Sequence, residues 1–215
     1  MIVDADVYIS VESILECAKE IRNAEKKGRK LWFIPYRQLY RLTTYASKKV
    51  LNSDPKSPFT FSSPPKEKYY TNKTEFQGTP VSRIGHWYGA MIQIMSRKAF
   101  YEVGGWDWRF SGWGGEDHAA MVAMDTLYGP HKTLPSQVLH LYHPMIISGN
   151  SDDAVNKRRL WTNQKEVGAN DALSGRYYYS NGNPERMRKL VNEFKDKNLN
   201  IQPQKNKSIP PNMSS

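Results

Sequence analysis

The sequence predicts an α/β fold in one domain of ordinary size. Short apolar segments with strand-like composition alternate along the chain with segments whose apolar residues recur at helical spacing. The chain has 215 residues, of which 39% are hydrophobic and 12% aromatic, and this is enough for a real core. It contains no run of about 18 apolar residues, so no membrane span is expected.

The first elements should be a strand, a helix and a second strand. Residues 1–8 alternate in a way that suits a strand ending at an acidic tip. A helix is expected from Val11 to Lys27, with Ser10 as its N-cap and Gly28 ending it in the left-handed conformation. The segment KLWFIPY then has the composition of another strand, which Pro35 stops.

The middle of the chain should be a long loop, at about residues 41–80. This stretch is rich in Pro, Ser, Lys and Thr and shows no sustained hydrophobic period. A connection of this length usually has a function or is disordered. Its aromatic residues argue against full disorder, so we expect a partly ordered excursion that folds over a site.

Regular structure should return in the second half. HWYGAMIQIMS suggests a buried strand, RKAFYEVGG a short helix and KTLPSQVLHLYHP another strand. A helix is expected over 116–128, with an apolar stripe of Ala120, Met121, Met124 and Leu127. DAVNKRRLWTNQKEV and NPERMRKLVNEFKDK should be surface helices. The domain would then cover 1–195, and a disordered tail would follow over 196–215.

The chain is basic, with a formal net charge of +10 and a sequence pI of about 9.5. Such a balance suits nucleic acid, an anionic surface, a phosphate-bearing ligand or simple solubility. The basic residues are dispersed and no groove-reading motif is present, so no nucleic-acid partner is expected. Cys17 is the only cysteine, which excludes an intrachain disulfide and favours a reducing compartment. It lies in a helical pattern and should be a small buried residue.

Asp4 and Asp6 form an acidic pair at the predicted strand end. A loop at this point would turn both carboxylates outward together. Two carboxylates at this spacing can hold a hard divalent cation and leave positions for diphosphate oxygens. The alternative is an acidic turn without a ligand.

A second acidic pair, Glu116 and Asp117, follows Trp113, Gly114 and Gly115 at the start of a predicted helix. The helix start stabilises anions, which by itself explains acids at this position. It does not explain the glycines, which let backbone approach a ligand, or the tryptophan. A tryptophan beside paired acids commonly binds a sugar, and an ionised carboxylate there could take a proton from an attacking hydroxyl.

His140 and His143 are the third candidate group. On a flat strand two residues three apart point to opposite faces, so the pair can bind a metal only if the backbone turns. Pro144 makes such a bend plausible. The alternative is that each is a hydrogen-bonded structural histidine. His118 lies beside the acids and is placed to tune them.

The segment WYGAMIQIMSRKAFYEVGGWDWRFSGWGGEDHAAMVAM resembles the C-terminal catalytic segment of the beta-galactosyltransferase and polypeptide N-acetylgalactosaminyltransferase group. The likeness lies in an aromatic-Gly-small strand, a helix ending in Gly-Gly-aromatic, and then Trp-Gly-Gly-Glu-Asp, in that order. With the Asp-x-Asp pair before it and His143 after it, the resemblance covers about residues 1–145. These enzymes have the glycosyltransferase-A fold, so the resemblance implies the C-terminal part of that fold.

The resemblance implies transfer of a sugar from a nucleotide-diphosphate donor, with uridine favoured, to a glycan or other hydroxyl acceptor. Asp6, with Asp4 nearby, would hold Mn2+ or another divalent cation against the diphosphate. His143 would be the second protein ligand, and His140 falls where the galactosyltransferase branch has another. Asp117 would be the general base, which implies inversion at the anomeric carbon.

The remaining roles concern the two substrates. Glu116 and Trp113 would position the acceptor sugar, while Gly89, Gly114 and Gly115 would let backbone approach the donor. His118 and Ala119 follow the Glu-Asp pair where the family usually has more acids, which implies different acceptor contacts.

In the resembling fold, βαβ units that build the uridine pocket precede the Asp-x-Asp pair, and here they are largely missing. Three explanations are open: a separate N-terminal donor-binding chain, a misplaced or truncated start, or lost donor binding. The last of these leads to an alternative function, a non-catalytic carbohydrate-binding or assembly subunit. With no anchor in the sequence, a cytoplasmic enzyme in a bacterial or phage-infected cell is expected.

Overall fold

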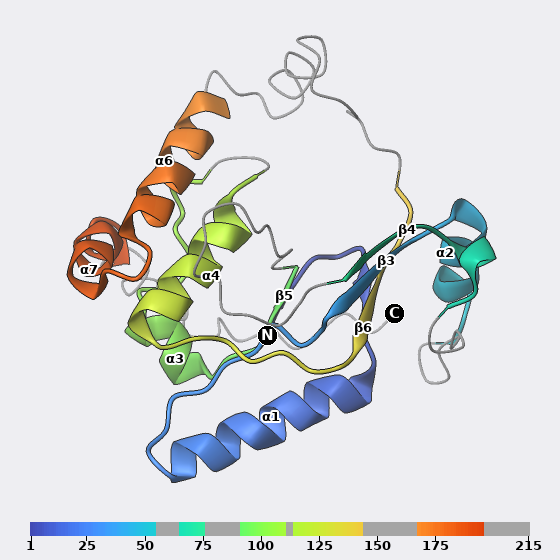
Figure 1. Cartoon of the computed structure of the whole chain (residues 1–215), viewed down its shortest axis with the longest axis horizontal. Coiled ribbons are helices and arrows are strands. Elements are labelled where there is room, and N and C mark those ends of the chain that lie inside the picture. Colours follow the sequence, from blue (N-terminus) through green and yellow to red (C-terminus); the bar gives the residue numbers. More distant parts are fainter. Residues whose placement is uncertain (55–64, 76–90, 111–113, 144–166, 196–215) are drawn as a thin grey trace, which may run out of the picture.

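The computed structural model describes residues 1–54, 65–75, 91–110, 114–143 and 167–195 (Figure 1). Its elements in chain order are β1 (Ile2–Val3), β2 (Val7–Tyr8), α1 (Val11–Lys26), β3 (Gln38–Leu42), α2 (Thr44–Leu51), the 3-10 helix η1 (Glu67–Tyr69), β4 (Tyr70–Glu75), β5 (Ile92–Gln93), α3 (Arg97–Glu102), α4 (Glu116–Leu127), β6 (Gln137–His140), α6 (Val167–Ser180) and α7 (Pro184–Asn192). This mixture of helices and small sheets confirms the α/β class and is compatible with a glycosyltransferase-A-like fold.

The strands form a four-stranded sheet in the order β2-β6-β3-β4 and a two-stranded sheet of β1 and β5. β3 and β6 are parallel, and the other pairs are antiparallel. Figure 1 shows α3, α4, α6 and α7 grouped on one side of the molecule and α2 beside β3 and β4 on the other. Because β2 and β6 are antiparallel neighbours, the carboxyl end of β6 and the turn before β2 meet at one edge of the larger sheet.

The predicted single strand over residues 1–8 is two strands in different sheets. β1 pairs with β5 and β2 pairs with β6, so the chain must turn between them. The backbone N–H of Asp4 donates to the Met91 carbonyl at 3.0 Å, and Val7 N–H donates to the Asp4 carbonyl at 3.4 Å. Aspartate is depleted in strands, and the two acids lie where the strand breaks.

The predicted strand in KLWFIPY was wrong. Phe33 makes only isolated bridges, to Ile94 and Lys132, and the regular strand is β3, which follows Pro35. Proline has no N–H to give a sheet, so the pairing at Phe33 does not continue as a ladder through Pro35. Trp32 and Phe33 are nevertheless buried in the main core.

Helix α1 agrees with its prediction. The Ser10 hydroxyl accepts a hydrogen bond from Ser13 N–H at 3.2 Å, and Gly28 has φ of 66° just past the helix end. Its buried face includes Cys17 and Ile21, which join the main core. Burial raises the pKa of the Cys17 thiol to about 12, which agrees with a structural role.

The stretch at about 41–80 is not a loop throughout. It contains α2, η1 and β4, while residues 55–64 and 76–80 lie outside the described part of the chain. α2 begins at a Thr43 cap, whose hydroxyl accepts from Ala46 N–H at 3.2 Å. The helix then covers a second small core of Tyr40, Leu42, Ala46 and Leu139. These tertiary contacts form regular structure where the sequence shows no period.

Helices α3, α4 and α7 and strand β6 confirm their predictions, although the buried face of α4 is wider than expected. That face consists of Ala119, Met121, Val122, Ala123 and Met124, while Ala120 and Leu127 are only half-buried. α4 packs against both α6 and α7, so more than one side of it is covered. α7 buries Met187, Leu190 and Val191 in the core.

Helix α6 was not predicted. Two glycines and a run of three tyrosines break its helical period, and its position depends on packing against α4. The predicted helix DAVNKRRLWTNQKEV lies almost wholly outside the described residues, as does the predicted tail over 196–215. Among the described helices, none has the length and apolar character that crossing a bilayer requires.

Candidate functional site

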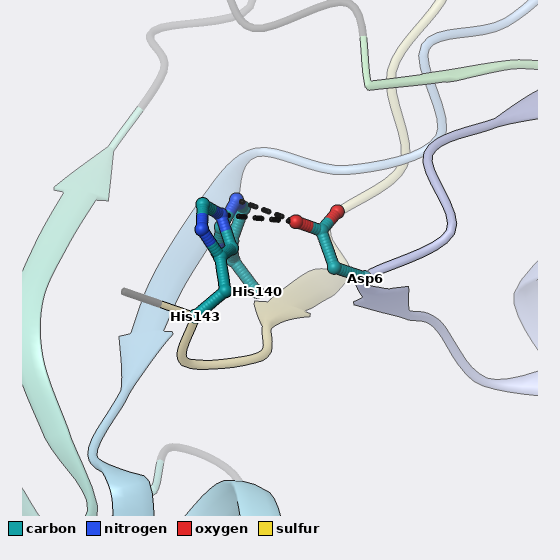
Figure 2. Close-up of side chains that lie close together, drawn as sticks. All are labelled: Asp6, His140 and His143. Carbon is teal, nitrogen blue, oxygen red and sulfur yellow. Dashed lines mark ion pairs between the residues drawn. The ribbon is translucent and has the colours of Figure 1, made fainter. Parts of the chain in front are cut away.

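Three predicted metal ligands, Asp6, His140 and His143, converge at the edge of the four-stranded sheet. Figure 2 shows both imidazole rings beside the Asp6 carboxylate. The Asp6 Oδ2 atom lies 3.1 Å from His143 Nε2 and 3.6 Å from His140 Nε2. One possible ligand atom from each residue lies within 4.8 Å of the other two, which is close enough for a shared metal ion.

A turn after β6 brings the two histidines to the same side. β2 and β6 pair with Val7 opposite His140, and the Leu141 N–H donates to the Asp6 carbonyl at 2.7 Å. The next N–H, from Tyr142, donates to the buried Ser47 hydroxyl of α2 at 2.7 Å. These two hydrogen bonds turn the backbone after His140 away from the direction of β6. As a result, the ring centroids of His140 and His143 lie 5.2 Å apart. The backbone bend that is needed for both histidines to bind one metal ion is therefore present.

His140 is prepared to act as a ligand through Nε2. Its Nδ1 lies 2.9 Å from the Leu141 carbonyl oxygen, which can only accept, so Nδ1 must hold the proton. Burial lowers the pKa of His140, and the charges of Arg41 and His143 lower it further against the opposing effect of Asp6. The neutral imidazole that results is the form that binds metals.

Asp4 lies outside that three-residue group but connects it to the second acidic pair. Burial raises the pKa of Asp4 to about 6, and the charges of Asp117, Asp6 and Glu116 add to this. The buried phenol of Tyr36 has its pKa raised by burial and then by Asp117 and Asp4. The acidic turn bonds Met91 and the start of α4 bonds Gln93, so the segment that contains β5 holds both in one region of the molecule.

Asp117 is held as an anion beside His118. Its Oδ1 accepts from the His118 backbone N–H at 2.7 Å and lies 3.0 Å from His118 Nδ1. Burial alone would raise the pKa of Asp117, but the hydrogen bonds and charge of His118 more than offset this, and the pKa is lowered. The Asp117 carbonyl accepts from the buried side chain of Gln93 at 2.9 Å, which anchors this turn to β5.

Glu116 turns back onto the glycine turn that precedes it. Its Oε2 accepts from Gly114 N–H at 3.0 Å. Burial raises the pKa of Glu116, and the charge of Asp117 adds to that effect, against the backbone hydrogen bonds. The two adjacent acids thus have pKa values shifted in opposite directions, an arrangement typical of acid and base groups in active sites.

Residues 81–143 match a protein-family model described as the N-terminal domain of galactosyltransferase. This segment is galactosyltransferase-like. The match supports glycosyltransferase activity with nucleotide-sugar and acceptor substrates, and Glu116, Asp117, His140 and His143 lie within the matched residues. The likeness to galactosyltransferases is thereby supported, while the C-terminal placement and the N-acetylgalactosaminyltransferase branch stay predictions. No curated protein and no solved structure matches the chain.

Within the galactosyltransferase-like segment, the turn Gly114-Gly115 is packed against α6. Both glycines have positive φ, 109° and 91°. The Asn170 amide of α6 donates to the Gly114 carbonyl at 3.2 Å. A Cβ on Gly115 would clash with the Ser174 hydroxyl of α6, whereas a Cβ on Gly114 would have no atom of the described residues within 4 Å. Packing therefore explains Gly115, and a role for the turn toward the donor stays a prediction.

We expect Gly115→Ala to destabilise the protein more than Gly114→Ala. Positive φ should cost each variant about 1–3 kcal/mol, and the Ser174 clash should add about 1–3 kcal/mol to Gly115→Ala only. Urea denaturation of both variants measures the difference. Adding Ser174→Ala should recover the second cost in the Gly115 variant and nothing in the Gly114 variant. Equal stabilities of the two single variants would contradict the close packing of α6 on the turn.

Two predicted site residues of the galactosyltransferase-like segment, Trp113 and Gly89, lie outside the described residues. The sequence interpretation missed Tyr36, Ser47 and Gln93, which surround the candidate site. Tyr36 and Gln93 both lie in apolar stretches of the sequence. Of the two, only Gln93 gave a signal of a special role, because a polar residue inside an apolar stretch needs a hydrogen-bond partner. Ser47 could not be identified, because its contact with Tyr142 joins distant parts of the chain.

Proposed function

We propose that this chain is the C-terminal catalytic region of a metal-dependent glycosyltransferase. Its region 1–195 moves a sugar from a nucleotide-diphosphate donor, with uridine as the nucleotide, to a hydroxyl of a glycan or other acceptor. The observation that supports this most strongly is the approach of Asp6, His140 and His143 to one another, in a chain with a galactosyltransferase-like segment.

The donor set fits a divalent transition metal. Two imidazoles and one carboxylate suit Mn2+ better than Mg2+, which prefers oxygen ligands alone. Asp6, His140 and His143 would hold the ion, with Asp4 close by to orient ligands of the open positions. A bound divalent ion would neutralise charge on the leaving diphosphate. The hydrogen bonds at Leu141 and Tyr142 keep the two imidazoles oriented before any ion binds.

Asp117 is the general base in this proposal. Its lowered pKa keeps it ionised at neutral pH, and His118 fixes the direction of its carboxylate. It would take the proton of the acceptor hydroxyl while that oxygen attacks the anomeric carbon, which inverts the configuration in one displacement. Glu116 and Trp113 would hold the acceptor sugar, and the backbone at Gly89, Gly114 and Gly115 would approach the donor.

A metal-binding experiment tests this function directly. We expect wild-type protein to bind Mn2+, which is measured from the electron paramagnetic resonance signal of the free ion. UDP should tighten that binding. Asp6→Ala should weaken binding by about 100-fold or more, since even outer-shell partners of a metal contribute 10–100-fold. Asp171→Ala, an exposed carboxylate on α6, is the matched control and should bind as wild type does.

Either of two results would contradict the proposal: no Mn2+ binding by wild type, or equal binding by Asp6→Ala. Glycan binding without affinity for UDP or Mn2+, measured by calorimetry, would instead support the alternative of a non-catalytic carbohydrate-binding or assembly subunit.

A further inference from the structure

The outer face of α2 bears a group of side chains that the candidate site does not use. Tyr45, Lys48, Lys49 and Asn52 recur at positions i, i+3, i+4 and i+7, so they form one stripe along the helix. Together with Ser53 they line a surface hollow of about 490 Å³. This volume is within the usual range of ligand sites, about 300–1,000 Å³. The helix contains no acidic residue.

The wall of this hollow is held in place by the neighbouring η1. Thr43 N–H donates to the Tyr69 carbonyl at 2.9 Å, and the rings of Tyr45 and Tyr69 are stacked at 10° with centroids 6.4 Å apart. Tyr69 also packs on the small core beneath α2. Tyr45 is 60% exposed, so burial does not explain the presence of this large side chain.

Two ammonium groups lie over these rings. Lys49 Nζ is 5.0 Å from the centroid of Tyr45, and Lys68 Nζ is 5.1 Å from that of Tyr69. A cation–π contact favours one position of a long side chain. An ammonium group carries three N–H donors, and its charge-assisted hydrogen bonds to anions are strong.

We propose that the α2 stripe is a binding site for an acidic oligosaccharide, one that bears carboxylate or sulfate groups. The ammonium groups of Lys48 and Lys49 bind the anionic groups, and the side chains of Tyr45 and Asn52 hydrogen-bond to sugar hydroxyls. A nucleobase would need an open aromatic face, whereas at least one face of each tyrosine ring is covered by a lysine. The choice of a saccharide rests on the proposed function, and the choice of an anion does not.

Helix α2 also supports the metal cluster through its opposite face. On its inner face, Ser47 accepts from the N–H of Tyr142, the residue before His143. The stripe is thus on the far side of the same helix that supports the turn of the metal cluster.

Calorimetry without metal or donor tests the site independently of catalysis. The probes are hexasaccharides of hyaluronan and of chondroitin sulfate, with maltohexaose as the neutral control. The Lys48→Glu/Lys49→Glu variant should bind the acidic probes about tenfold or more weakly. Lys26→Glu/Lys27→Glu carries the same charge change at the end of α1, and it should bind as wild type does.

Several outcomes would overturn the proposal. These are no binding of either acidic probe by wild type, equal binding of maltohexaose, or equal losses in the two lysine-pair variants. Tighter binding of a single-stranded oligothymidylate would overturn it in favour of a nucleic-acid surface. Tyr45→Ala should also weaken the binding of the acidic probes. Because this variant keeps every charge, it distinguishes a specific site from general electrostatic attraction. Because Mn2+ and UDP are absent, failure of the metal site would leave these results unchanged.

Discussion

Asp117→Asn should lower the rate of sugar transfer by about 10²–10⁴-fold, the range that a general base contributes. The substitution keeps the size and planar shape of the side chain, and the amide oxygen can still accept from His118 N–H. What it removes is the ability to accept a proton from the attacking hydroxyl. The variant should therefore fold and bind Mn2+ as wild type does, with the loss confined to kcat.

Release of UDP from UDP-galactose, measured with a panel of saccharide acceptors, provides the rate. Asp171→Asn makes the same chemical change at an exposed position on α6 and should leave the rate unaltered. Glu116→Gln should raise the acceptor KM more than it lowers kcat, because Glu116 positions the acceptor in the proposal. Full activity in Asp117→Asn would remove the base assignment and leave the metal assignment standing.

The parts of the fold that the sequence predicted well are those determined by local signals. Ser10 and Gly28 determine the ends of α1 whatever the rest of the chain does, since a cap acts on its own helix. α4 likewise begins after a glycine with positive φ. Such elements are predictable because the residues that stabilise them are neighbours in sequence.

The errors concern elements that depend on distant partners. Residues 1–8 alternate like one strand, but β5 and β6 lie on different sheets and divide it. α6 has poor helical propensity and is held by contacts such as Asn170 to Gly114, from 56 positions earlier. No local pattern contains this information, because the energy that decides the structure comes from tertiary packing.

The candidate site divides in the same way. The acids and histidines were identified from their residue types and their order along the chain, and the backbone bend between His140 and His143 was stated as a condition for metal binding. The bend itself depends on Ser47, in a helix that the sequence did not predict. Residue types with chemical function can therefore be predicted, while the residues that orient them follow from the fold.

Asp107→Ala should destabilise the protein by about 3–5 kcal/mol, the usual cost of removing one partner of a buried ion pair. Asp107 is 6% exposed and accepts from the Arg109 side chain at 2.9 and 2.7 Å and from the Tyr177 hydroxyl at 2.8 Å. Hydrogen bonds with Asp107 raise the pKa of Arg109, and burial followed by the charge of Asp107 raises that of Tyr177. Without the carboxylate, Tyr177 loses this hydrogen bond and Arg109 is left with its ion pair to Glu193.

The expected loss is measured by urea denaturation, with exposed Asp171→Ala as the control and Tyr177→Phe as a smaller step. Tyr177→Phe removes one hydrogen bond and should cost about 1 kcal/mol, so the Asp107 variant should lose clearly more. Tyr177 lies on α6, which also holds the glycine turn before Glu116 through Asn170. Loosening α6 should therefore reduce transfer more than Mn2+ binding, because the metal cluster is built on β2 and β6 instead. A stability change below about 1 kcal/mol would show that Arg109 is satisfied by Glu193 alone.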